Sequence, residues 1–511
     1  IKRLGIPSIM LTDGPHGLRK QGGKADHLGL NKSIPATCFP TASALANSWD
    51  AELLERVGAC LGEEAAAEGV SVVLGPGLNC KRNPLCGRNF EYFSEDPYLS
   101  GKLAAAMVRG IQSQGVSACP KHYAVNSQET RRMVIDESVD ERALRELYLE
   151  GFRYAITEGK PRTIMSAYNR VNGTYANEST HLLQDILYGE WGYDGVVVTD
   201  WGGENDRVAG LIAGNQLEMP SSAGMTDREV VLAVQSGALD EALVDERVDS
   251  LLRLVFDFAQ QARPANPDAM EVHRQLAREA ARRAAVLVKN EGGVLPLKTD
   301  MRVAVIGDFA KRPRYQGAGS SLIVPTRLEN ALDALQHTEL EITGYEPGFR
   351  RFGGADAGKA RKAVALARRA DVALVFLGLD EGSEAEGVDR EHMRLPENQT
   401  QLLSKIRAVC GRVVVVLANG APVESGWAAD ADAVLLGYLG GQEGAGAVAD
   451  LITGKAVPCG KLAETYPIAY ADIPSSGIYP GMTRAEHRES IFVGYRYFDT
   501  AKKPVAWPFG Y

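Results

Sequence analysis

Short apolar runs alternate with helical patterns through the first half of the chain. Four of these runs end on polar or aromatic residues, and they span 70–79, 115–126, 161–169 and 192–203. Between them, residues 50–68 have a helical pattern that Gly69 would end, and a second helix is expected to begin at the S-x-x-E capping spacing of Ser138 and Glu141. A strand, loop and helix repeated over the first ~250 residues predict a (β/α) barrel or a doubly wound sheet.

The second half resumes this rhythm with runs that are apolar almost throughout. They are rich in Val, Leu and Ala, and they span 302–308, 371–380, 412–420 and 432–441. Such runs are typical of parallel strands covered on both faces. Because a Pro-rich stretch precedes them, we expect a first domain over 1–262, a linker over 263–290 and a second α/β domain over 291–511.

Composition and charge narrow the class of protein. The 511 residues exceed one ordinary domain, and 45% hydrophobic with 24% charged residues is ordinary for a globular protein. The net charge of −9 is spread along the chain without basic stripes, so no nucleic-acid partner is expected. No apolar run approaches the ~20 residues that span a bilayer, so no membrane is expected either.

The seven cysteines have no regular spacing, which favours reduced thiols in the cytoplasm over a zinc site or a disulfide framework. The numbered chain begins without Met, so the question of whether a leader has been trimmed stays open. The sequence also leaves open whether the chain forms a homo-oligomer. The 305–321 stretch lacks the dinucleotide fingerprint, and no phosphate-loop or metal-binding spacing occurs, so neither cofactor nor metal is expected. Gly317 and Gly319 instead suggest a loop that reaches towards a site.

Reactive side chains follow the predicted strands of the first half. Lys121 and His122, Tyr168, and Asp200 with Trp201 each lie at a strand end. Taken singly, such residues often cap helices or face solvent. Together they supply a cation, an imidazole, a carboxylate and aromatic rings, which suit the binding and attack of a hydroxylated ring.

Three further stretches carry charge. Arg88 lies among acids in 82–101, and Asp13 lies on a Gly/Pro turn. After a predicted strand of the second half, an acidic loop carries Glu381, Glu384 and Glu386. Such a loop is usually a solvated face, but α/β domains bind ligands at this end of their strands. We expect one of the three glutamates to act opposite Asp200, and the residues alone do not choose which.

Motifs along the whole chain resemble glycoside hydrolase family 3. In order, they are DGPHG, GRNFEYFSEDPYLSG, KHYAVNSQETRR, MSAYNRVNG, GYDGVVVTDWGG, VLVKNEGGVLPL, EGVDREHMRLP, GKLAETYP and FVGYRYFD. The resemblance implies a β-glucosidase that releases terminal non-reducing β-D-glucose with retention from a small-molecule or oligosaccharide β-glucoside. It also implies a TIM-barrel-like domain followed by an (α/β) sandwich. Relatives usually continue into a fibronectin-III-like domain, which we expect to be absent from this chain.

The resemblance also implies roles for single residues. Asp200 matches the family's nucleophile and Glu386 its acid/base. The sugar-binding residues of the family match Asp13, Arg88, Lys121, His122 and Tyr168. Trp201 would line the aglycone side of the site. Nearby cations would then favour ionised Asp200, and Glu386 would need a raised pKa to donate a proton.

The chain departs from the family pattern, and rival functions stay open. Gln216 stands where many relatives carry an aspartate, and no lectin-like insert is visible over 323–370, which leaves the aglycone side less enclosed. Within the family, β-xylosidase, α-L-arabinofuranosidase and β-N-acetylglucosaminidase are rivals. A non-catalytic sugar-binding relative would have lost a carboxylate, and both Asp200 and Glu386 are present.

Overall fold

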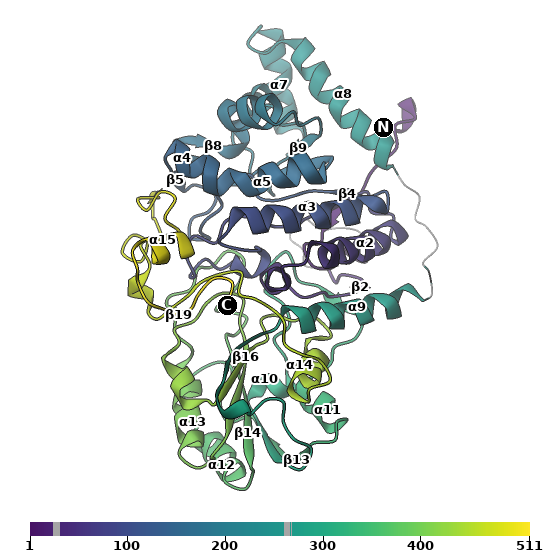
Figure 1. Ribbon diagram of the computed structural model, residues 1–511. Coiled ribbons are helices and arrows are strands. Elements are labelled where there is room, and N and C mark those ends of the chain that lie inside the picture. The colour runs from purple at the N-terminus through teal and green to yellow at the C-terminus, as the bar shows by residue number, and fades with distance from the viewer. Residues whose placement is uncertain (24–30, 260–265, 267) are drawn as a thin grey trace.

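The computed structural model describes residues 1–23, 31–259, 266 and 268–511. They form two α/β domains, and the C-terminal segment, yellow in Figure 1, leaves the second domain and returns to the first. The boundary expected at Ala262 lies outside the described residues, so the domain limits stay predictions. None of the described helices is long and apolar enough to cross a membrane.

Short parallel strands build the core of the first domain. They are β1 (Leu11–Asp13), β3 (Val72–Leu74), β4 (Ser117–Ala118), β6 (Thr163–Met165) and β9 (Val196–Val198). Ladders join β1 to β3, β3 to β4, and β6 to β9, while a bridge between Tyr123 and Ser166 links β4 to β6. A further parallel bridge joins Val198 to Leu217. Neighbours in sequence are therefore neighbours in space, as in a (β/α) barrel, and the barrel-like prediction is confirmed.

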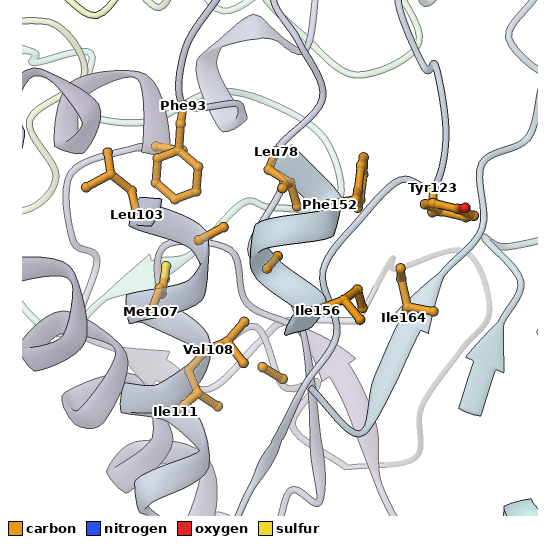
Figure 2. Packing of buried hydrophobic residues seen from close by; sticks show 14 of the residues in the cluster. Leu78, Phe93, Leu103, Met107, Val108, Ile111, Tyr123, Phe152, Ile156 and Ile164 are labelled. Carbon is orange, nitrogen blue, oxygen red and sulfur yellow. The ribbon is translucent and has the colours of Figure 1, made fainter. Parts of the chain in front are cut away.

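Helices α2 (Ala51–Ala67) and α3 (Pro97–Ser113) cover this core side by side. They approach closely because glycines lie at their contact: a Cβ on Gly58 would lie 2.4 Å from the Met107 carbonyl oxygen. Figure 2 shows the apolar face of α3, with Leu103, Met107 and Ile111, beside Phe152 and Ile156 of the next helical segment. Burial of these side chains fixes the helices against the strands.

The two predicted helix boundaries had different outcomes. Asp50 caps α2 by accepting from Leu53 N, and Gly69 follows its end with φ +67°, as expected. The helix predicted from Ser138 begins later, because Ser138 belongs to β5 (Asp136–Ser138) and Asp140 is the N-cap. The capping prediction at Ser138 was therefore wrong.

The second domain contains a six-stranded sheet in the order β13-β11-β14-β15-β16-β10. The strands are β10 (Val286–Asn290), β11 (Arg302–Ile306), β13 (Glu341–Glu346), β14 (Val372–Gly378), β15 (Val413–Ala418) and β16 (Ala433–Leu436). All pair in parallel except β10, which runs antiparallel to β16. The helices α11 (Ala331–Gln336), α12 (Ala357–Ala367), α13 (Glu397–Arg407) and α14 (Gly444–Ile452) accompany it. The expected α/β sandwich is confirmed.

Strand order places two loops of this domain next to each other. The chain passes from β11 to β13 on one side and then returns to β14 on the other, so the loops after β11 and β14 leave the sheet at the point where the order reverses. Open α/β sheets bind ligands at this switch point. The segment expected as a linker contains α9 (Ala269–Ala284) and the edge strand β10.

Two strand pairings hold the domains together. β12 (Val324–Pro325) pairs with β2 (Pro35–Ala36), and β18 (Arg484–Glu486) of the C-terminal segment pairs with β5. A buried ion pair between Arg82 and Glu489 lies beside β18. The relative position of the domains is thus fixed by backbone hydrogen bonds as well as by side chains.

Candidate functional site

The predicted residues of the first domain meet at the carboxyl ends of its strands. Asp13 ends β1, Arg88 lies in the segment after β3, and Lys121 with His122 follow β4. Tyr168 follows β6, and Asp200 with Trp201 follow β9. Barrel enzymes place their active sites at this end, because loops from separate strands converge there.

The acidic loop after β14 brings Glu386 to these residues. Glu386 Oε1 lies 2.8 Å from Arg132 Nη1 and 3.8 Å from Arg88 Nη1. Its other oxygen accepts a hydrogen bond of 2.6 Å from Ser320 N, in the loop after β11. Gly319 has φ +123°, and a Cβ on it would lie 2.3 Å from Glu386 Cβ. The glycine loop therefore reaches the site, as the sequence suggested.

The other two glutamates of the loop have different partners. Glu384 is buried, pairs with the buried Arg314 and accepts from Gly420 N at 2.9 Å. Glu381 pairs with Arg351 at 2.8 Å, and its side chain is 40% exposed. Of the three glutamates, Glu386 is the one that contacts the arginines of the first domain's cluster.

Charged and polar groups surround the two carboxylates of the first domain. Lys121 Nζ lies 3.6 Å from Asp13 Oδ1. His122 Nε2 lies 3.5 Å from Asp200 Oδ2, while Tyr92 Oη lies 3.1 Å from the other ring nitrogen of His122. The backbone N–H of Trp201 donates to Asp200 Oδ1 at 2.8 Å.

Several buried polar atoms here lack a hydrogen-bond partner among the described residues. They include Arg88 Nη1, His122 Nε2 and Asp200 Oδ2. Buried polar groups are almost always hydrogen-bonded, so three such atoms in one cluster point to a polar ligand. Two nitrogens and a carboxylate oxygen can bind a molecule that carries hydroxyl groups and an electrophilic carbon.

The cations favour ionised Asp200, as expected, whereas the pKa of Glu386 differs from the sequence-based expectation. Burial raises the pKa of Asp200, and Arg88 and Lys121 offset only part of this. Burial acts to raise the pKa of Glu386 as well, but Arg88 and Arg132 outweigh it and hold that pKa below its usual value. The expectation of a raised pKa at Glu386 was wrong for this state of the site, because the arginines pair with Glu386 rather than with Asp200.

Arg132 was missed by the sequence analysis. It contacts Glu386, and its guanidinium lies 4.9 Å from the centre of the Tyr168 ring. Its position in KHYAVNSQETRR, beyond Lys121 and His122, was a signal that could have identified it. Trp201 is partly exposed and packs on an apolar cluster that includes Leu74.

Gln216, the departure noted in the sequence, supports the barrel. Its Oε1 accepts from Val197 N at 2.7 Å, and its amide nitrogen donates to Tyr188 Oη at 2.9 Å. Gln216 therefore has a structural role beside β9.

Comparison with known proteins extends this picture. The model of the glycosyl hydrolase family 3 N terminal domain matches residues 2–254, and that of the glycosyl hydrolase family 3 C-terminal domain matches residues 285–511. Thermostable beta-glucosidase B of Acetivibrio thermocellus is 50% identical over 515 residues, covering 100% of this chain and 68% of that protein. Exo-alpha-(1->6)-L-arabinopyranosidase of Bifidobacterium longum is 44% identical over 526 residues, covering 100% and 69%. The crystal structure of a Bifidobacterium adolescentis GH3 beta-glucosidase superposes with a TM-score of 0.94 at 43% identity, covering 100% of this chain and 74% of that one.

Proposed function

The chain belongs to glycosyl hydrolase family 3, and on that premise we propose that it is a β-glucosidase that releases terminal β-D-glucose with retention of configuration. The observation that carries the residue assignment is the position of Glu386. A loop of the second domain brings this carboxyl to Arg88 and Arg132 of the first domain. The charge of Glu386 also raises the pKa of Asp200, so the two carboxyls interact.

Asp200 is the proposed nucleophile. Its Oδ2 is the oxygen without a hydrogen-bond partner among the described residues, whereas Oδ1 accepts from Trp201 N. Attack by Oδ2 on the anomeric carbon forms a glycosyl ester as the bond to the leaving oxygen breaks. Arg88, Lys121 and His122 would donate hydrogen bonds to the ring hydroxyls. The Asp13 carboxylate would accept from them, and Tyr168 would contact the same ring.

Glu386 is the proposed acid and base. It gives a proton to the leaving oxygen in the first step and takes one from water in the second. The reactive form carries one proton on the two carboxyls, with that proton on Glu386 and with Asp200 ionised. In interacting carboxyls the apparent pKa values belong to the pair, so a low pKa of Glu386 in the free site lowers the population of this form without removing it.

The arabinopyranosidase relative provides a second candidate specificity. β-D-Glucose carries a hydroxymethyl group that a pentopyranose lacks. A panel of p-nitrophenyl glycosides separates the candidates: β-D-glucopyranoside, α-L-arabinopyranoside, β-D-xylopyranoside, α-L-arabinofuranoside and N-acetyl-β-D-glucosaminide. We expect the highest kcat/KM for the glucoside. A higher value for any pentoside would overturn the glucose assignment, and no hydrolysis of any member would favour a non-catalytic sugar-binding protein.

Azide rescue tests the roles of the carboxyls. Glu386→Ala should lose hydrolysis of natural glucosides and regain turnover of an activated aryl glucoside in azide, with a β-glucosyl azide as product. Asp200→Ala should give an azide product of inverted configuration. The matched control is Glu381→Ala, which changes the same loop at a position that pairs with Arg351 outside the site. Rescue of Glu381→Ala instead of Glu386→Ala would refute the assignment.

We also propose a cytoplasmic location. All seven cysteines lie among the described residues and are free thiols, which supports a reducing compartment.

A further inference from the structure

Three segments contact or contain Glu386, and each carries an exposed apolar residue within two positions of the residue that makes the contact or of Glu386 itself. One contains Arg132, which pairs with Glu386, and another contains Ser320, whose N–H donates to it. The third is the acidic loop itself. The apolar side chains are Met133, Leu322 and Val388, which are 40%, 46% and 51% exposed. They lie one residue after Arg132, two after Ser320 and two after Glu386.

Met133 is also next to the turn that carries the nucleophile. A methyl group built on Gly202 would lie 3.9 Å from Met133 Cε, and Gly202 directly follows Trp201. Met133 therefore connects the two halves of the reaction site: its neighbour in sequence holds Glu386, and its side chain lies against the turn after Asp200.

The two sides of the site differ in polarity. The side chains of Arg88, Lys121 and His122 are each at most 2% exposed, so the donors for the sugar ring form a closed polar side. The exposed apolar residues belong to the three segments that contact or contain Glu386, and the Met133 side chain lies beside Gly202. Because Glu386 gives its proton to the leaving oxygen, the groups that flank it also flank the leaving group.

We propose that Met133, with Trp201, forms an apolar aglycone-binding surface, and that the preferred substrates are β-glucosides with an alkyl or aryl aglycone rather than with a second sugar. The inference rests on the proposed function, including the role of Glu386. An apolar aglycone gains binding free energy by covering exposed apolar area, whereas a sugar presents hydroxyl groups to a methionine that offers no strong hydrogen-bonding partner.

The test compares octyl β-D-glucoside with cellobiose as substrates of the full chain. Wild type should have the higher kcat/KM for the octyl glucoside. Met133→Gln keeps the length of the side chain, and it should lower kcat/KM for the octyl glucoside about three- to ten-fold while leaving cellobiose within about two-fold. Met133→Leu should retain the wild-type ratio. The matched control is Val134→Thr, at the adjacent apolar residue, whose side chain is 45% exposed. This substitution should change kcat/KM for neither substrate.

The results distinguish failure of the aglycone inference from failure of the proposed glucosidase function. If Met133→Gln lowers kcat/KM equally for both substrates, Met133 does not select the aglycone. The same follows if Val134→Thr changes the ratio of the two kcat/KM values as much. Either result overturns the inference and leaves the glucosidase function intact. A wild-type preference for cellobiose overturns it as well. If wild type hydrolyses neither these substrates nor p-nitrophenyl β-D-glucoside, the proposed function itself fails, and the inference fails with it.

Discussion

The three glutamates of the acidic loop after β14 allow stability and catalysis to be separated by matched substitutions. Glu384→Gln removes one negative charge with almost no change in shape. The side chains of Glu384 and Arg314 are 2% and 0% exposed, so the substitution leaves the Arg314 charge buried without its partner. Glu381→Gln makes the same chemical change where the side chain is 40% exposed.

The expected magnitudes follow from burial. Breaking a buried ion pair from one side costs about 3–5 kcal/mol, because an uncompensated charge stays in the interior. A domain of this size loses roughly 2–4 °C in Tm per kcal/mol, so Glu384→Gln should lower the Tm of the second domain by about 6–20 °C. The exposed pair of Glu381 is worth about 0–1 kcal/mol, so Glu381→Gln should change Tm by at most about 4 °C.

Differential scanning calorimetry and steady-state kinetics together make the assay. Glu384→Gln should have a low Tm while remaining active well below it. Glu386→Gln should be inactive even well below its Tm, and its Tm should also fall, because Arg88 and Arg132 lose the charge that they pair with. If Glu384→Gln and Glu381→Gln unfold within about 2 °C of each other, the buried ion pair does not stabilise the loop and the reasoning fails.

Three further predictions concern titratable groups. Asp200→Asn should lower kcat by a factor on the order of 10⁴ or more, because the proposed nucleophile is removed. It should not lower Tm, because burial raises the pKa of this carboxyl and its charge therefore opposes folding. Calorimetry of the inactive variant checks the Tm. Burial raises the pKa of Glu137 to about 8, so the native state keeps a proton that the unfolded chain releases above about 4.5, and stability falls as pH rises through this window. The free energy of unfolding measured in urea should therefore fall between pH 6.5 and pH 8 by about 2 kcal/mol less in Glu137→Gln than in wild type. An equal fall in both proteins would contradict a protonated Glu137 in the native state. Arg132→Met should raise the pKa of Glu386 and, because Glu386 has the lower pKa of the pair, move the acidic limb of kcat/KM to higher pH, whereas an unmoved limb would show that Arg132 does not hold the Glu386 charge.

The first domain's part of the site was predictable from local sequence signals. Lys121, His122, Tyr168 and Asp200 each follow an apolar run, and parallel strands bring their carboxyl ends together. The choice of Glu386 came from the family motif, since an acidic loop alone does not show which glutamate faces inward. Its contacts now provide a physical reason for that choice.

Other features depended on contacts that sequence patterns do not encode. The expectation of a raised pKa at Glu386 failed because it required knowing which carboxyl Arg88 and Arg132 would pair with. The helix start at Ser138 was displaced because β18 recruits that residue into a strand, and β18 lies far away in sequence. Tertiary pairing thus overrode a local capping signal.

The pairing of β18 with β5 has a consequence for synthesis of the protein. On the ribosome, β5 emerges long before β18, so its outer edge stays unpaired while most of the second domain is still being made. His487, which contacts Glu137 across 350 residues, is missing throughout that interval. An open strand edge beside an unpartnered buried carboxyl is a target for chaperones and a risk for misassembly. We therefore expect a nascent chain to acquire glucosidase activity only after residue 489 has left the exit tunnel, however early the barrel strands have formed.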